Sequence, residues 1–398
     1  MLSFEETVLK LKNILPNNIL KYNLLTHDIE LTSKLPFSRV DVKDHTINDR
    51  EILEIRYYFE CTTKAKTSTK MITDAIIIVA VENPYHPIRD WLETLKWDGV
   101  KRLNKWLIDY CGAEDEKYVR EVGRKVLVAS IARVYQPGIK FDYMLILEGE
   151  TGIGKTQLVK ALGEDWSIDI ELRDCDKDTI DKMRGAWIIE IPELAGMKRT
   201  EIETLKAFLS RPMDRERLAY ARRSENFPRQ SIFIGTHNPS GNNTYFWDDT
   251  GNRRFWPITC QKADYEGVRR VRDQLFAEAY IEWFAKKEKL YITDSEIIKK
   301  VEEEQRNRLA SDPWQDTISK YLIGKDEQAI TGKEILEHLK IFPEKQTVSH
   351  LMRVGIVMKK LGWEKRRPLI GDNRQWAYKN KNEVKNEPRE QPTEIWPE

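Results

Sequence analysis

Short apolar runs that end in glycine or polar residues recur along the middle of the chain. The first, at 143–147, is followed by a glycine-rich loop and then by apolar residues at helical spacing. Two more runs, at 186–189 and 231–236, end in carboxylates and in a His-Asn pair. Runs of this length, separated by segments with helical periodicity, predict buried strands of a parallel sheet. We therefore expect an α/β core between residues 141 and 290, with a short edge strand at 166–170.

The segment before this core has mainly helical patterns. Helices are expected at 4–14, 71–81, 88–97, 100–111 and 117–135, whereas 51–59 fits a helix or a strand. A Pro-rich break at 83–87 marks a boundary. The sequence thus predicts a helical N-terminal region, with an accessory domain at 1–82 that has no catalytic constellation and a helical collar at 83–140.

Beyond residue 290 the pattern is again helical and ends in a hairpin. A charged connector is expected at 291–316, followed by a helix that a capping box at Thr331 begins. The next helix, at 347–361, is expected to turn its apolar residues inward: Val348, Leu351, Met352 and Ile356. Two helices and a two-stranded hairpin predict a winged helix at 317–380. The polar tail at 381–398 is expected to be disordered.

Composition limits the class of protein. The 398 residues are 40% hydrophobic and 33% charged with a net charge of +1, so any DNA-binding surface must concentrate its positive charge locally. The longest apolar run, 75–81, is too short to span a membrane. The four cysteines lie far apart without a C-x-x-C pair, which argues against a zinc site or a disulfide framework and fits a reducing cytoplasm.

The glycine-rich loop has the composition of a phosphate site. Residues 149–156 read GETGIGKT and fit G-x-x-x-x-G-K-[ST] between a predicted strand and a predicted helix. Backbone N–H groups and the helix start attract phosphate, Lys155 would reach the β- and γ-phosphates, and Thr156 would offer a hydroxyl to Mg²⁺. The alternative is a glycine-rich turn with no ligand. The predicted nucleotide-binding residues are Gly149, Glu150, Thr151, Gly152, Ile153, Gly154, Lys155, Thr156 and Gln157.

Polar residues at the ends of the next two strands complete a hydrolase pattern. Glu190 and Glu193 follow the second apolar run, where one can hold Mg²⁺ and the other can polarise the attacking water. Asn238 follows the third run and can sense the γ-phosphate. The alternatives are two solvated surface glutamates and a turn residue before Pro239.

Basic residues gather in three later segments. Arg253 and Arg254 stand in the run GNRRFWP, where they fit either an arginine finger directed at a neighbouring subunit or a salt-bridged loop anchor. A hairpin with a basic tip is predicted at 214–230, and residues 345–379 contain nine basic and two acidic side chains. The predicted DNA contacts are Arg222, Arg223, Lys359, Lys360, Arg366 and Arg367. A winged helix that docks a protein instead is the alternative.

The ordered motifs resemble one known family. HPIRDWLETLKWDGVKRL, GETGIGKT, WIIEIPEL, LKAFLSRPMD, IGTHN and TGNRRFWPI occur in this order over about 84–290. They resemble the virulence-associated protein E family, ATPases of phages and mobile elements of the superfamily 3 helicase type. The resemblance implies an AAA+-like P-loop core that binds ATP and Mg²⁺. It places Lys155 in Walker A, Glu190 and Glu193 at Walker B, Asn238 at the sensor, and Arg222 and Arg223 on a pore hairpin.

The resemblance also implies roles for Arg253 and Arg254 at the finger loop and for Lys206 in the motif after Walker B. This sequence departs from the family pattern because Ile191 and Pro192 separate the two acids. Which glutamate serves the metal, and which arginine acts as the finger, therefore stays open.

Together these features predict an ATP-dependent DNA helicase. It would work as a homo-oligomeric ring, a hexamer, on single-stranded or forked DNA during replication of a phage or mobile element. The alternative is a DNA-binding replication initiator whose ATPase controls assembly. A small-molecule P-loop kinase would leave the arginine loop and the basic winged helix without a role.

Overall fold

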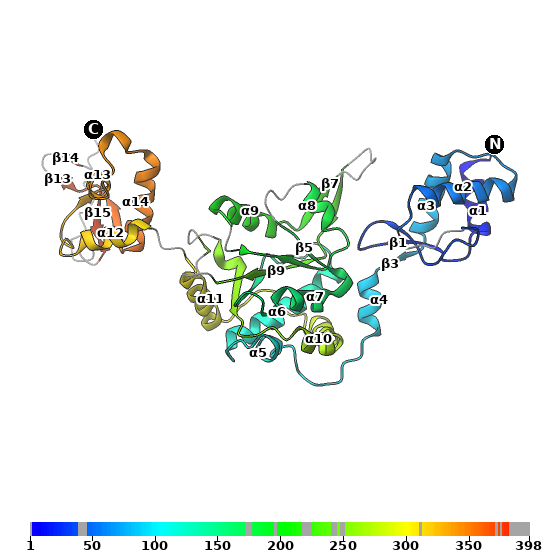
Figure 1. The fold of residues 1–398 in the computed structure, drawn as a ribbon, viewed down its shortest axis with the longest axis horizontal. Helices are drawn as coiled ribbons and strands as arrows, with labels where there is room; N and C mark the ends of the chain where they lie inside the picture. Colours follow the sequence, from blue (N-terminus) through cyan, green and yellow to red (C-terminus); the bar gives the residue numbers. More distant parts are fainter. Residues whose placement is uncertain are drawn as a thin grey trace, which may run out of the picture. The chain divides into compact units, whose positions relative to one another are not determined.

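The computed structural model describes residues 2–38, 46–171, 177–194, 197–216, 224–239, 245–246, 251–309, 313–370, 373–374 and 376–381. The chain divides into two compact units, Met1–Leu309 and Ala310–Glu398. The division falls inside the segment that the sequence suggested as a connector. Figure 1 shows the ribbon of each unit.

The N-terminal segment combines helices with a small sheet. Its helices are α1 (Phe4–Ile14), α2 (Asp49–Thr63) and α3 (Thr69–Val81). Its strands, in the order β2-β1-β3, are β2 (Ile29–Leu31), β1 (Leu20–Asn23) and β3 (Pro84–Tyr85). The prediction of a helical N-terminal region is therefore wrong in this respect. The strands are two to four residues long, too short to give a clear period-2 pattern.

Three helices lead from this segment to the core: α4 (Pro87–Thr94), α5 (Trp106–Cys111) and α6 (Lys117–Tyr135). The predicted helix at 100–111 is wrong in its first half, since α5 begins only at Trp106. The backbone N–H groups of Arg102 and Leu103 donate instead to Oε2 of Glu278, at 2.7 and 2.8 Å. A buried carboxylate of α10 (Tyr265–Lys286) thus holds this segment outside a helix.

A five-stranded parallel sheet forms the centre of the first unit. Its order is β10-β4-β9-β6-β5. The strands are β10 (Phe255–Thr259), β4 (Met144–Glu148), β9 (Ile232–His237), β6 (Ile188–Ile191) and β5 (Ser167–Asp169). Every residue of β4, β6 and β9 is buried, as expected for a parallel sheet with helices on both faces. The edge strand expected at 166–170 is present as β5.

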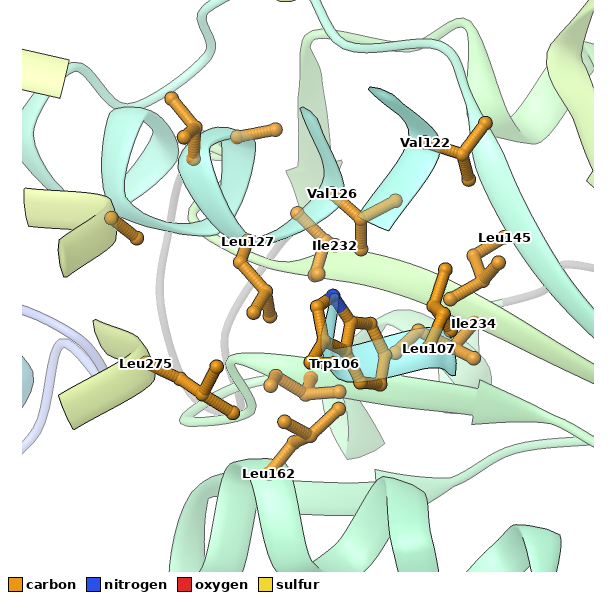
Figure 2. Close-up of a cluster of buried hydrophobic side chains, with 14 of the residues drawn as sticks. Trp106, Leu107, Val122, Val126, Leu127, Leu145, Leu162, Ile232, Ile234 and Leu275 are labelled. Carbon is orange, nitrogen blue, oxygen red and sulfur yellow. The ribbon is translucent and has the colours of Figure 1, made fainter. Parts of the chain in front are cut away.

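Helices cover both faces of the sheet (Figure 1). Leu145 and Leu147 of β4 belong to a core with α6, α10 and α7 (Lys155–Gly163), whereas Met144 and Ile146 belong to a second core with α9 (Arg199–Leu209). Figure 2 shows part of the first core, where side chains from the helices gather around the sheet: Trp106, Leu127, Leu162 and Leu275 beside Leu145, Ile232 and Ile234. Successive residues of one strand therefore serve different cores.

Two further helices and a pair of strands belong to the first unit. Helix α8 (Lys177–Lys182) precedes β6, and α11 (Ser295–Asn307) follows the sheet. Strands β7 (Met213–Glu216) and β8 (Glu225–Pro228) pair antiparallel as the base of the predicted hairpin. Residues 217–223 between them, which include Arg222 and Arg223, lie outside the described residues.

The second unit is built from three helices and short antiparallel strands. The helices are α12 (Pro313–Leu322), α13 (Gly332–His338) and α14 (Val348–Lys360). Strands β11 (Ile330–Thr331), β15 (Ala377–Asn380) and β12 (Trp363–Arg366) form one sheet, and β13 (Leu369–Ile370) pairs with β14 (Asn373–Arg374).

The prediction for the inner face of α14 is wrong. The residues expected inside are exposed: Val348 by 69%, Leu351 by 37%, Met352 by 66% and Ile356 by 42%. The helix instead buries Val354, Val357 and Met358. Both sets have helical spacing, so the sequence pattern alone does not say which stripe faces the core.

Candidate nucleotide site

The glycine-rich loop joins the end of β4 to the start of α7. A Cβ added at Gly149 would lie 2.6 Å from the carbonyl oxygen of Cys260, which is too close for any side chain. Gly154 has a φ of +100°, a backbone conformation that other residues rarely adopt. The loop is therefore closely packed against the segment after β10 at one end and tightly turned at the other. Both glycines of the motif are required by this geometry.

Lys155 is the first residue of α7 and is buried. Its Nζ donates to the carbonyl oxygens of Gly149 and Glu150, at 2.6 and 2.8 Å. Burial lowers the pKa of this amine. The first backbone N–H groups of a helix have no hydrogen-bond partner within the helix. Because Lys155 begins α7, its ammonium and these unpaired N–H groups lie at the same loop. This arrangement suits an anion.

Glu190 on β6 is 1% exposed and reaches the start of α7. Its Oε1 accepts hydrogen bonds from the hydroxyls of Thr156 and Thr236, both at 2.8 Å. Strand β9 lies between β6 and β4, which explains why Thr236 of β9 takes part. The second carboxylate oxygen, Oε2, is buried and has no hydrogen-bond partner among the described residues. A buried carboxylate oxygen of this kind, next to a hydroxyl, fits a hard cation such as Mg²⁺.

The two predicted acids lie on or just after the same strand but differ in their exposure. Glu193 lies beyond the end of β6, is exposed, and has a φ of +54°. Asn238 directly follows β9 and is half-buried. The carbonyl oxygen of His237 accepts the N–H of Gly149 at 3.2 Å, so Asn238 stands beside the start of the loop. Glu190 and Asn238 thus lie at the loop end of the sheet.

Arg253 and Arg254 lie at the other end of the sheet. Strands β10 and β4 are parallel, with Phe255 opposite Met144 and Thr259 opposite Glu148. The arginines precede Phe255, whereas the glycine-rich loop follows Glu148. At about 3.3 Å per strand residue, the length of β4 puts roughly 15 Å between the two ends. The structure therefore does not bring the arginines to the loop of their own chain.

The two arginines differ in their surroundings. Arg254 is half-buried, and its guanidinium donates to Oγ of Ser210 at 2.8 Å and to the carbonyl oxygen of Gly251 at 3.2 Å. Arg253 is exposed and lines a cleft of about 540 Å³ together with residues of α11. Lys206 is buried beside Gly251 and pairs with Glu203 at 2.7 Å. Arg254 is thus an anchor of the loop, and Arg253 is the accessible member of the pair.

A buried ion pair lies at the end of β4, directly before the glycine-rich loop, and the sequence analysis did not predict it. Glu148, the last residue of β4, is fully buried and makes two hydrogen bonds with the guanidinium of Arg308, at 2.6 and 2.5 Å. The hydroxyl of Tyr245 donates to the same carboxylate at 2.6 Å. Burial alone would lower the pKa of Arg308, but the contact with Glu148 raises it. For Glu148, the sequence offers one indication, a charged residue at the end of an apolar run. No sequence pattern points to Arg308, which lies 160 residues later.

The predicted DNA contacts are only partly described. Arg222 and Arg223 lie outside the described residues, but the base of their hairpin is fixed by a buried pair. Arg229 binds both oxygens of Asp214, at 2.6 and 2.7 Å. In the second unit, the other candidates lie at the end of α14 and on and after β12. Lys359, Arg366 and Arg367 are exposed and Lys360 is half-buried.

A family model described as the virulence-associated protein E-like domain matches residues 92–310, more than half of the chain. This chain belongs to the virulence-associated protein E-like family. The match confirms the resemblance seen in the sequence motifs. It spans the glycine-rich loop, Glu190, the arginine pair and Arg308, so these features all lie within the virulence-associated protein E-like domain.

Two solved structures of the NrS-1 C-terminal region are similar in fold. Its apo structure has a TM-score of 0.51 and 11% identity, covering 90% of this chain and 95% of that one. Its A form has a TM-score of 0.50 and 12% identity, with 91% and 96% covered. At such identities the likeness concerns the fold alone. No curated protein matches this sequence. Within the described ranges, no helix is long and apolar enough to cross a membrane.

Proposed function

We propose that this virulence-associated protein E-like chain hydrolyses ATP and couples hydrolysis to movement along DNA, as a superfamily 3-type helicase in replication of a phage or mobile element. One observation carries the proposal. A glycine-rich loop at the start of a helix meets a buried carboxylate, Glu190, through the hydroxyl of Thr156 at 2.8 Å. This is the arrangement that a P-loop nucleoside triphosphatase requires.

The loop and Lys155 would bind the triphosphate. Lys155 is already at the loop, where it can exchange its two carbonyl contacts for phosphate oxygens. Thr156 and Glu190 would hold Mg²⁺, which when bound neutralises charge on the β- and γ-phosphates. In the part of the chain that the structure describes, no group of three His, Cys, Asp or Glu side chains could hold a metal. A site with one carboxylate suits Mg²⁺, which keeps several of its waters.

The remaining polar residues at this end of the sheet would position the attacking water. Because Glu190 contacts Thr156, we assign it to the metal. Glu193 and Asn238 then orient the water for in-line attack on the γ-phosphate. The reaction needs charge stabilisation more than covalent chemistry, and these groups provide it.

A neighbouring subunit would supply the arginine finger. Arg253 is exposed and lies at the end of the sheet opposite to the loop of its own chain. A head-to-tail contact between subunits can bring it to the next loop, and repeated contacts of this kind close into a ring. We therefore propose a homo-oligomeric ring, a hexamer, in which each ATP site is shared by two chains.

DNA would contact the hairpin of β7 and β8 and the C-terminal unit, which we propose to be a winged helix. A second candidate function is a replication initiator whose ATPase controls assembly. The exposed Arg366 and Arg367 on and after β12 favour it, because basic groups on such a hairpin suit phosphates of duplex DNA.

The test is an ATPase and unwinding assay on the purified protein. We expect Mg²⁺-dependent hydrolysis that single-stranded DNA stimulates, together with unwinding of a forked substrate. Lys155→Ala should abolish both, whereas Lys160→Ala, an exposed lysine on the same helix, should leave both intact. Hydrolysis without unwinding, combined with a footprint at one duplex sequence, would favour the initiator. No hydrolysis under any condition would overturn both.

A further inference from the structure

The C-terminal unit has a groove with a volume of about 1010 Å³. Its lining includes four large apolar side chains, which we call the apolar floor: Val348, Leu351 and Met352 of α14 and Trp376, which precedes β15. These four side chains are between 37% and 69% exposed. Soluble proteins rarely expose a contiguous apolar patch that has no binding role. An occupant of matching chemistry is therefore expected in the groove.

Helix α14 is apolar on two faces, and only one of them serves the core of its unit. Val354, Val357 and Met358 are fully buried, whereas Val348 and Met352 follow the groove. A second apolar stripe on an otherwise packed helix suits the binding of another peptide segment. Base edges in duplex DNA are read mainly by polar side chains, which this floor lacks.

The charged residues that line the groove, which we call its rim, are mainly basic. Among the described residues, the rim has one acidic member, Glu364, which pairs with Arg366 at 2.8 Å. Five basic residues line it: Lys333, Lys359, Lys365, Arg366 and Lys381. An occupant should therefore combine bulky apolar side chains with negative charge.

The chain continues from this rim into a segment with that composition. Residues 382–398 read NEVKNEPREQPTEIWPE, with five glutamates, one lysine and one arginine. The stretch 390–398 has three glutamates, no basic residue, and the pair Ile395-Trp396. Lys381 itself lines the groove, and the fourteen residues from there to Ile395 can span up to roughly 45 Å. The segment can therefore return to the groove from its point of attachment.

We propose that residues 382–398 bind this groove, with Ile395 and Trp396 on the apolar floor and the glutamates against the basic rim. The bound segment would cover Lys359 and Arg366, so it competes with nucleic acid for this surface. This inference does not depend on ATP hydrolysis, because it concerns a different unit and a different ligand.

The test measures binding of a labelled synthetic peptide of residues 382–398 by fluorescence anisotropy. A chain that ends at Lys381 should bind it saturably. The full chain should bind it at least about tenfold more weakly, because its own attached segment competes at an effective concentration on the order of millimolar. In the shortened chain, Met352→Glu and Trp376→Ser should each weaken binding at least tenfold. Ile323→Glu is the matched control, since Ile323 is 78% exposed but lies outside the groove.

Two further arms identify the chemistry. A peptide with Ile395→Ser and Trp396→Ser should not bind, and Lys365→Glu should weaken binding of the native peptide. The proposal is overturned if the peptide does not bind the shortened chain, or if it binds the Met352→Glu chain equally well. It is also overturned if an oligonucleotide, and not the peptide, depends on Met352 and Trp376, since the groove would then be a nucleic-acid surface.

Discussion

The two ends of the central parallel sheet carry different kinds of polar side chain. At the carboxyl end, Lys155 and Glu190 are buried and make contacts within their own chain. At the amino end, Arg253 is exposed at the edge of a cleft. The groups that would bind phosphate and metal are therefore held in place before any ligand arrives. The group that would complete the site is displayed at the surface, where a second chain can receive it.

The difference follows from the topology. Parallel strands place all their carboxyl ends at one edge, so residues that follow strands β4, β6 and β9 converge there. Arg253 precedes its strand and is placed at the opposite edge by the same rule. Within one chain, Arg253 therefore does not lie beside the glycine-rich loop and Glu190.

The amino end is tested first by replacing its exposed arginine. Arg253→Ala should lower kcat about 10³-fold or more, as loss of an arginine finger does. The melting temperature should not change, because the side chain is exposed. Arg254→Ala should lower the melting temperature as well, since it removes the contacts with Ser210 and Gly251. If Arg253→Ala keeps full activity while Arg254→Ala loses it without destabilisation, the assignment of the two arginines is reversed.

The carboxyl end is tested by comparing its two acids. Glu190→Gln should lower kcat by about 10²-fold or more and shift the Mg²⁺ dependence to higher concentration, because the amide is a weaker ligand. Glu193→Gln should lower kcat with an unchanged Mg²⁺ dependence. Titration of activity with Mg²⁺ separates the two. An unchanged Mg²⁺ midpoint for Glu190→Gln would place the metal elsewhere.

Breaking the ion pair between Glu148 and Arg308 should lower the stability of the fold. Arg308→Met leaves the carboxylate of Glu148 buried, with the hydroxyl of Tyr245 as its one remaining side-chain donor among the described residues. Breaking such a pair costs about 3–5 kcal/mol of unfolding free energy. Arg269→Met is the matched control on an exposed pair and should change stability by about 0.5 kcal/mol or less. Denaturant titration measures both, and a small effect of Arg308→Met would show that the pair is not needed.

The smallest effect is expected from Thr236→Val, which keeps the side-chain shape and removes one of two donors to Glu190. Loss of one hydrogen bond to a carboxylate should cost about 1.5–3 kcal/mol in stability. The hydroxyl of Thr156 still holds the carboxylate, so we expect kcat to fall about tenfold or less. A thermal melt together with steady-state ATPase rates is sufficient. A loss as large as that of Glu190→Gln would mean that Thr236 itself contacts the reacting groups.

Features with a strong local pattern could be predicted from the sequence. The strand, loop and helix around Lys155 follow from the apolar run and the glycines, and the edge strand β5 and helix α6 are present as expected. The family was also recognisable, because several motifs occur in a fixed order. Residues that depend on tertiary contacts were missed. Thr236 reaches Glu190 only because β9 lies between β6 and β4, and Arg308 finds Glu148 from 160 residues away.

Errors arose where two patterns compete. Helix α14 has two apolar stripes, and Val348 and Met352 were assigned to the core although they are exposed. The segment before Trp106 has helical spacing, but Glu278 holds its backbone outside a helix. For the segment before Trp106, the deciding contact comes from a residue far away in the sequence. For α14, what decides is which of the two apolar stripes packs on the core. Local periodicity carries no information about either choice.

The most direct test of a shared ATP site is a mixing experiment. Lys155→Ala and Arg253→Ala chains, each inactive alone, are coexpressed with different tags and purified as mixed oligomers. An intact loop of one chain then meets an intact Arg253 of its neighbour at about a quarter of head-to-tail contacts, if the chains mix at random. We predict that ATPase activity returns toward that fraction of the wild-type rate. Mixed oligomers that form but stay as inactive as either parent would contradict a site shared between two chains.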